Sequence, residues 1–275
     1  MSEKNCKGKT PEDYGFHMPE KKNSFKIDLN EKSSVKKIIG VVSGKGGVGK
    51  SFVTSMLACE MARRGYRVGV LDGDITGPSQ TKAFGIHEKA MGDGKYIYPY
   101  ITKNGIQVIS TNMILDSDET PVIWRGPMVA NILKQFYTDV VWDNVDYMFV
   151  DMPPGTSDVP LTAFQSFPLD GIVVVTSPQE LVSMVVEKAI NMAQSMDIKV
   201  LGLIENMSYV ECPNCNEKIE IFGKSHINEV SEKYGLPVLA KIPMRQTVAA
   251  SADDGTMEDL EIPEIKDAVS FIEGE

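Results

Sequence analysis

The segment GKGGVGKS, residues 44–51, constrains the fold more than any other part of the chain, because it fits the pattern G-x-x-x-x-G-K-[ST]. It follows the apolar run at 36–43 and opens a stretch with helical spacing at 50–64. Glycines at these positions let backbone N–H groups approach phosphate oxygens, and the start of the next helix favours the same anion. The segment therefore predicts a phosphate-binding loop between a strand and a helix.

Short runs rich in β-branched residues recur from residue 36 onward, and most lack the polar alternation of a half-exposed strand. Strands covered on both faces have this pattern. The runs are residues 36–43, 66–72, 106–110, 145–151, 171–177, 199–206 and 237–243. Helical candidates between them include residues 50–64, 126–140, 179–196 and 223–234. This alternation predicts an α/β fold, a three-layer P-loop NTPase with a mostly parallel central sheet flanked by helices.

The domain organisation follows from length and composition. A chain of 275 residues with 42% apolar and 24% charged residues is long enough for one large α/β domain or two small ones, and no internal repeat or linker divides residues 35–275. Residues 1–34 are polar with only scattered apolar side chains, so we expect a disordered N-terminal tail. We expect residues 35–275 to form one P-loop ATPase domain that carries a cysteine-bearing segment at 207–216 and an exposed hairpin at 91–105.

The charge of the chain disfavours several classes of partner. Lys and Arg total 28 against 38 Asp and Glu, a net charge of −10, whereas nucleic acids and anionic lipids recruit basic surfaces. No apolar run reaches the ~20 residues that cross a bilayer, and the N-terminus lacks the apolar core of a signal peptide. The four cysteines are unevenly spaced and do not form a disulfide framework. We therefore expect a cytoplasmic protein with no nucleic-acid or membrane partner.

Charged residues gather at the ends of the predicted strands, where ligands bind in such sheets. In the loop itself, Lys50 would neutralise the β- and γ-phosphates of a nucleotide, and Ser51 would bind Mg²⁺. Asp151 ends the run 145–151 and is a natural partner for the same metal ion. Asp72 ends the run 66–72 and Asp74 follows it, and two carboxylates at a buried strand end need a cation or water nearby. A purely structural role, capping the helix near residue 78, is the alternative for this pair.

The segment CPNC, residues 212–215, offers two thiolates, whereas a tetrahedral zinc ion or an iron–sulfur cluster usually has four ligands. The remaining candidates are weak. Cys59 lies within a predicted helix and is expected in the core, Cys6 lies in the tail, and His226 falls on the next predicted helix. The residues of one chain therefore leave open both the metal and the source of the other ligands.

Six motifs together resemble one group of ATPases. They are GKGGVGKS (44–51), DGDITGPS (72–79), WRGPM (124–128), VDMPPGTSD (150–158), ENMSYVECPNC (205–215) and IPMRQTV (242–248). The group is that of the deviant-Walker-A ATPases, with MinD, ParA and the nitrogenase iron protein. Within it the chain is similar to the Mrp/ApbC family of iron–sulfur cluster carriers over roughly residues 36–260.

The resemblance implies a homodimeric ATPase that uses ATP and Mg²⁺, with nucleotides near the dimer interface. Lys45 matches a signature lysine that reaches the partner's phosphates, and Asp74 matches a switch residue that positions the attacking water. Asn206 matches an adenine-recognising residue, with the loop 243–247 beside the base. The expected catalytic residues are Lys45, Lys50, Asp74 and Asp151. The expected nucleotide contacts are Gly44, Lys45, Gly46, Gly47, Val48, Gly49, Lys50, Ser51, Phe52, Asp72, Asp74, Pro154, Asn206, Pro243 and Arg245.

The resemblance also implies that two chains share one [4Fe-4S] cluster through their CxxC pairs. Cys212 and Cys215 from each of two chains would supply the four ligands that one chain lacks, and closed symmetric dimers are the commonest oligomers. The function implied is an ATP-dependent carrier that receives a cluster from donor proteins and transfers it to apo-proteins.

Two other functions compete with the carrier hypothesis. The same thiolates could hold zinc in a dimeric ATPase that acts as a scaffold or targeting chaperone, because thiolates alone do not decide the metal. A ParA- or MinD-type positioning ATPase is the third candidate. The net charge and the acidic C-terminal segment 261–275 disfavour it, and such a function does not require CPNC.

Overall fold

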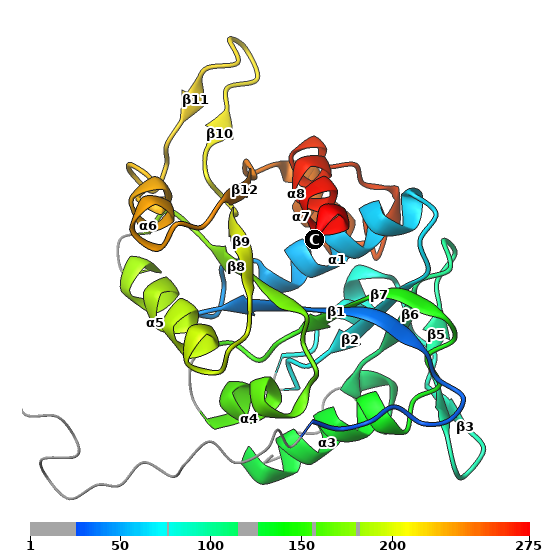
Figure 1. Ribbon diagram of the computed structural model, residues 1–275. Helices are drawn as coiled ribbons and strands as arrows, with labels where there is room; N and C mark the ends of the chain where they lie inside the picture. Colours follow the sequence, from blue (N-terminus) through cyan, green and yellow to red (C-terminus); the bar gives the residue numbers. More distant parts are fainter. Residues whose placement is uncertain (1–25, 76, 115–125, 156–157, 180–181) are drawn as a thin grey trace, which may run out of the picture.

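The computed structural model describes residues 26–75, 77–114, 126–155, 158–179 and 182–275. An eight-stranded sheet crosses the middle of the molecule, with helices on both faces (Figure 1). The strand order is β12-β9-β8-β1-β7-β2-β6-β5. The predicted three-layer α/β fold is therefore confirmed.

The seven strands that pair in parallel coincide with the seven predicted runs. They are β1 (Val35–Ser43), β2 (Val68–Asp72), β6 (Gln107–Ile109), β7 (Val145–Asp151), β8 (Gly171–Thr176), β9 (Val200–Glu205) and β12 (Val238–Lys241). The eighth strand, β5 (Tyr100–Ile101), runs antiparallel to β6 at the edge. The central strands are buried on both faces, which explains why their sequences lack polar alternation.

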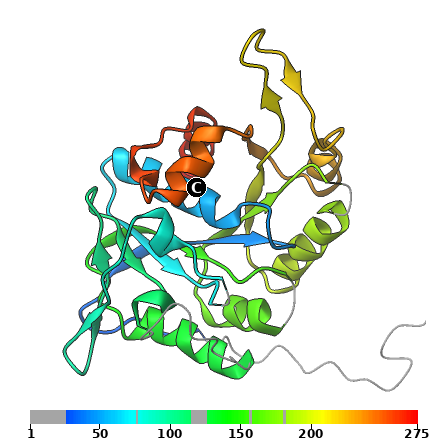
Figure 2. The same ribbon diagram turned by 180° about the vertical axis from the view of Figure 1, so that it is seen from behind.

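The helices form two layers (Figures 1 and 2). They are α1 (Lys50–Arg63), α2 (Gln80–Ala83), α3 (Gly126–Thr138), α4 (Asp158–Ser166), α5 (Val182–Ser195), α6 (Ile227–Tyr234), α7 (Gln246–Asp253) and α8 (Pro263–Gly274), with short 3-10 turns at Thr111–Met113 and Met257–Asp259. Helices α1, α7 and α8 cover one face of the sheet, and α3, α4 and α5 cover the other. None of the described helices combines the length and apolar character needed to cross a membrane.

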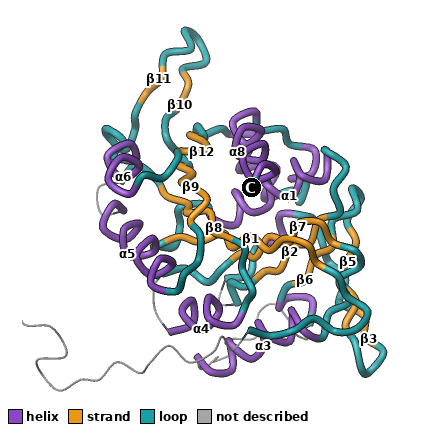
Figure 3. The backbone as a smooth tube through the Cα atoms, viewed as in Figure 1, coloured by secondary structure: helices purple, strands orange, loops and turns teal. Residues whose placement is uncertain are grey.

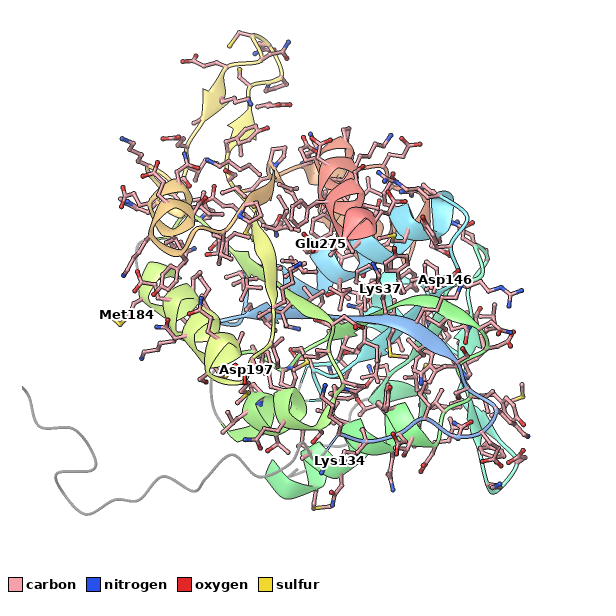
Figure 4. The ribbon with its side chains drawn as sticks, viewed as in Figure 1. Lys37, Lys134, Asp146, Met184, Asp197 and Glu275 are labelled. Atoms are coloured by element: carbon pink, nitrogen blue, oxygen red, sulfur yellow. The ribbon has the colours of Figure 1, made fainter. Side chains whose placement is uncertain are left out.

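Helix α1 is buried on most of its surface because it lies between the sheet and α8. This position fixes the direction of the phosphate-binding loop that precedes it. Helix α5 instead shows one buried face, with Val186, Ile190 and Ala193 inward. Met184, in its first turn, points outward and is 62% exposed (Figure 4).

Two small hairpins stand outside the main sheet. Strands β3 (Met91–Gly92) and β4 (Ile97–Tyr98) pair within the segment 91–105, as predicted, but β5 in the same segment joins the main sheet. Strands β10 (Val210–Glu211) and β11 (Lys218–Ile219) form a hairpin that extends away from the domain (Figure 3).

The predicted tail ends earlier than residue 34. The backbone N–H of Ile27 donates to the carbonyl of Ser166 at 3.1 Å, and both Ile27 and Leu29 contact the core. The Asn30 amide donates to the carbonyls of Thr138 and Val140, each at 2.8 Å, and so satisfies groups at the end of α3. Residues 26–34 therefore belong to the folded domain, and residues 1–25, which include Cys6, lie outside the described part.

Candidate functional site

The glycine-rich loop lies between β1 and α1, at the carboxyl ends of the parallel strands. Asp146, at the start of β7, lies at the opposite rim of the sheet (Figure 4). Gly47 and Gly49 have φ of 84° and 83°, the left-handed region that favours glycine. A Cβ on Gly44 would lie 2.2 Å from Val185 Cγ1 in α5. The loop is thus held closely against α5, and its glycines are needed for both its turns and its contacts.

Gly49 provides a test of this geometry. A Cβ there would lie 2.1 Å from Asn206 Nδ2, which donates to the Val48 carbonyl at 3.0 Å. We expect Gly49→Ala to lower the free energy of unfolding by about 1–3 kcal/mol, because it combines a strained φ with displacement of a buried amide. Gly46→Ala is the matched control, because a Cβ on Gly46 meets no heavy atom within 4 Å. Urea unfolding measures both, and equal stability of the two variants would contradict this account of the loop.

Lys50 lies between two carboxylates. Its Nζ forms an ion pair with Asp151 and lies 3.8 Å from Asp74 Oδ2. Lys50 is 5% exposed and Asp151 is fully buried. The structure therefore brings together three of the four residues predicted to be catalytic, whereas Lys45 is exposed on the outer side of the loop. An anion bound in the loop would compete with Asp151 for Lys50.

Gln80, which sequence reasoning missed, completes the surroundings of Asp151. Its Nε2 donates to Asp151 Oδ2 at 2.9 Å and lies 3.0 Å from the Ser51 carbonyl. Its Oε1 accepts a hydrogen bond from Ser55 at 2.7 Å. Thr54 Oγ1 lies 3.4 Å from Asp151 Oδ1. Gln80 thus connects the start of α1 to the end of β7, and only its place shortly after DGDITGPS could have suggested this.

Asp72 binds backbone groups that follow β2 and others at the start of α2. It is fully buried, and the backbone N–H groups of Asp74, Ser79 and Gln80 each donate to its carboxylate at 3.2 Å. Ser110 Oγ donates at 3.0 Å. These contacts agree with the structural alternative, in which this carboxylate caps the start of α2.

Burial, reinforced by the charge of the neighbouring Asp151, raises the pKa of Asp72 to about 7. Because the pKa of Asp72 is higher in the folded state, its protonated form favours folding. This contribution to the free energy of unfolding is complete below the ordinary pKa near 3.8 and is lost as the pH rises to about 7. Above that range the site holds two buried carboxylates, Asp72 and Asp151, and the partly exposed Asp74 around one lysine. A divalent cation would offset this excess of negative charge.

Among the remaining predicted nucleotide contacts, Asn206 touches the loop directly. Asn206 is buried directly after β9 and touches the loop through Val48. Ser51, Phe52 and Pro154 are half-buried. Pro243 follows β12, but the Arg245 guanidinium is turned toward α8, where it forms a two-point contact with Glu264 at 2.9 and 2.5 Å. Thr76, residues 156–157 of the motif VDMPPGTSD and the Trp-Arg part of WRGPM lie outside the described residues.

The cysteine pair lies in the turn of the β10–β11 hairpin, away from the glycine-rich loop (Figure 1). The Cys212 N–H donates to the Glu217 carbonyl at 2.9 Å, and the Cys212 carbonyl accepts from Asn216 at 2.9 Å. Backbone N–H groups of Asn214 and Cys215, together with the Cys215 thiol, lower the pKa of Cys212. A thiol that ionises more easily is a better metal ligand.

In the described part of the chain, the cysteine pair is not joined by a third side chain in a group that could hold a metal ion. No group of three or more His, Cys, Asp or Glu residues there could hold a metal ion. Cys59 is fully buried in α1, where burial raises its pKa to about 12. His226 instead contacts Glu229, with Nδ1 at 3.1 Å from Oε1.

These features define a class of protein. A glycine-rich loop that leads from a parallel strand into a buried helix, with its lysine facing carboxylates at the ends of the neighbouring strands, is the site of a P-loop NTPase.

Comparison with known proteins specifies the family. The profile of the family described as "NUBPL iron-transfer P-loop NTPase" matches residues 34–273. An iron-sulfur cluster carrier protein of Clostridium perfringens is 46% identical over 234 residues, which cover 82% of each chain. One from Methanocaldococcus jannaschii is 43% identical over 225 residues, covering 81% of this chain and 78% of the relative. The chain belongs to this family of iron-transfer P-loop NTPases, as its motifs predicted.

Solved structures agree with this assignment. A nucleotide-binding protein from Archaeoglobus fulgidus, in complex with ADP, has a TM-score of 0.75 and 39% identity, over 84% of this chain and 90% of that one. The cell division ATPase MinD from Pyrococcus furiosus has a TM-score of 0.62 over 86% of this chain and 98% of its own. At 19% identity, MinD supports the fold alone.

Proposed function

We propose that this protein is an ATP-binding and ATP-hydrolysing carrier that holds an iron–sulfur cluster between two subunits and transfers it to apo-proteins in the cytoplasm. The observation that carries the proposal is the short connection between two sites. Asn206 contacts the phosphate-binding loop, and the chain then leads directly into the hairpin that presents Cys212 and Cys215. The names of relatives such as the Clostridium perfringens carrier support the same function.

The nucleotide part of the proposal uses the oxygen and nitrogen atoms around the loop. Lys50 would leave Asp151 for the β- and γ-phosphates, and the backbone N–H groups of 44–51 would hold the phosphate oxygens. Ser51 and Asp151 supply hard oxygen ligands, which suit Mg²⁺, and the buried carboxylates favour a cation there. When bound, Mg²⁺ would neutralise charge on the transferring phosphoryl group. Asp74, close to Lys50, would orient the attacking water.

The cluster part of the proposal requires a homodimer. Each chain presents two thiolates on a hairpin that stands clear of its domain, so two hairpins can meet without a clash between domains. Ile219 on this hairpin and Ile221 and Phe222 just after it are 48%, 57% and 37% exposed. Apolar side chains beside a metal site exclude water and are suited to burial against a second copy. Lys45, exposed on the loop, is available to reach the phosphates of that copy.

Anaerobic reconstitution with iron and sulfide tests this function. We expect about four irons and four sulfides per two chains, with a broad absorption band near ~400 nm from thiolate-ligated iron. The iron should elute at the mass of a dimer. One tightly held zinc ion per two chains that iron does not displace would contradict the carrier and favour the zinc-bridged scaffold.

A further inference from the structure

The cysteine hairpin is part of a longer excursion, residues 208–225, which leaves the domain after β9 and returns just before α6. Most of its residues from 211 to 224 are exposed, so the domain can hold the excursion only near its two ends. The first end is Ser208, which is 7% exposed, and the second is Ser225, which is half-buried. The direction in which the cysteines project therefore depends on what fixes these two serines.

One buried carboxylate binds both ends. Ser208 Oγ donates to Glu205 Oε2 at 2.5 Å, and Ser225 Oγ donates to Glu205 Oε1 at 2.5 Å. Glu205 is the last residue of β9 and is only 1% exposed. A charged acceptor makes stronger hydrogen bonds than a neutral one, and burial increases this difference. The two oxygens of Glu205 thus join the two ends of the excursion, which lie 3 and 20 residues after Glu205 in the sequence.

The end of β9 is also hydrogen-bonded to the glycine-rich loop. The backbone N–H of Asn206 donates to the Thr176 carbonyl at 2.8 Å, and its side chain donates to the Val48 carbonyl at 3.0 Å. The Glu205 carbonyl accepts a bond from Ile242 at 2.8 Å. A displacement of Asn206 would therefore be passed to the carboxylate next to it.

We propose that Glu205 is a positioning residue, whose carboxylate fixes the direction of the 208–225 excursion and connects it to the glycine-rich loop through Asn206. The connection to nucleotide binding rests on the proposed function. Nucleotide that contacts Asn206 would thereby change how firmly both ends of the excursion, and hence Cys212 and Cys215, are held. Glu205 acts through the two serines, as a positioning residue rather than a ligand.

The test removes the two hydroxyl groups and leaves Glu205 in place. In the metal-free, full-length protein, Ser208→Ala/Ser225→Ala should make backbone amides at 206–212 and 223–227 exchange at least about tenfold faster, because two charge-assisted bonds are lost. Ser231→Ala is the matched control, since this serine, in the neighbouring α6, donates to a backbone carbonyl (Leu236, 2.6 Å) rather than to Glu205. The variant Ser208→Ala/Ser225→Thr restores one hydroxyl and should recover part of the protection.

Adding magnesium–ADP to the same amide-exchange experiment tests the connection between the glycine-rich loop and the excursion. In the wild type we expect it to slow exchange both at the start of α1 and at the two ends of the excursion. In the double alanine variant, magnesium–ADP should still slow amide exchange at the start of α1 but should no longer affect exchange at the two ends of the excursion. Equal slowing of amide exchange in the excursion of both proteins would contradict the connection through Glu205. Slowing of exchange in α1 alone in the wild type would contradict it as well. If ADP leaves α1 unchanged, the proposed nucleotide binding fails, while the nucleotide-free comparison with Ser231→Ala still decides whether Glu205 holds the excursion.

Discussion

Replacing Lys50 by alanine is expected to lower the free energy of unfolding of the nucleotide-free protein by about 3–5 kcal/mol, because it leaves a buried carboxylate without its cation. Asp151 is fully buried, and its other nearby donors are the neutral Gln80 and Thr54. The same change should weaken binding of magnesium–ADP at least about 100-fold, because Nζ can no longer donate to the phosphates. Urea unfolding and calorimetric titration measure the two effects.

A second substitution separates these effects. Lys50→Ala/Asp151→Asn removes the unpaired charge, so the double variant should regain most of the lost stability while its ADP affinity stays low. Lys45→Ala is the matched control from the same loop. Because Lys45 is exposed, we expect stability close to that of the wild type. If the double variant is as unstable as Lys50→Ala, the ion pair with Asp151 does not stabilise the site as described. In cells, cluster transfer by Lys50→Ala equal to the wild type would contradict ATP dependence.

The parts of the fold that could be predicted from the sequence are those that depend only on the residues of their own segment. A strand covered on both faces is mostly apolar, so runs such as 145–151 and 171–177 can be predicted without knowledge of their neighbours. Residues 26–34 were assigned to the tail because their few apolar side chains form no pattern. Their place in the domain depends on Asn30, which bonds to carbonyls more than a hundred residues away. No local pattern predicts such a contact.

The difference between features set by one segment and features set by distant contacts also applies to the candidate site. The glycine-rich loop and its lysine were predicted, because the spacing of the motif itself carries the chemistry. Gln80 and Glu205 were missed, although both are buried polar side chains that join distant segments. Gln80 meets Asp151 only when the sheet forms, with Asp72 and Asp151 in register on adjacent strands, and Ser225 meets Glu205 only when the chain returns to the end of β9. The turn of Arg245 toward Glu264 has the same origin, and its predicted contact with nucleotide stays a prediction.

Replacing both cysteines of the hairpin, in Cys212→Ala/Cys215→Ala, is expected to abolish iron and sulfide binding, because each chain then supplies no thiolate to the cluster. The fold should be unaffected within about 0.5 kcal/mol, since Cys215 is exposed and Cys212 is half-buried. Cys6→Ala is the control, as it removes a thiol of the predicted tail and should load iron like the wild type. Iron retained by the double variant would contradict the assignment of the ligands.

Mixed dimers distinguish a shared cluster from separate ones. Wild-type chains with an affinity tag can be reconstituted together with untagged Cys212→Ala/Cys215→Ala chains, and the fraction that contains iron can be isolated at the mass of two chains. If two chains share a cluster, a mixed pair has only two thiolates, so the iron-containing fraction should consist of wild-type chains alone. If each chain holds its own metal, mixed pairs would carry half the iron of wild-type pairs. That second outcome would contradict the shared site, and with it the reason for placing Cys212 and Cys215 on a hairpin that extends beyond the domain.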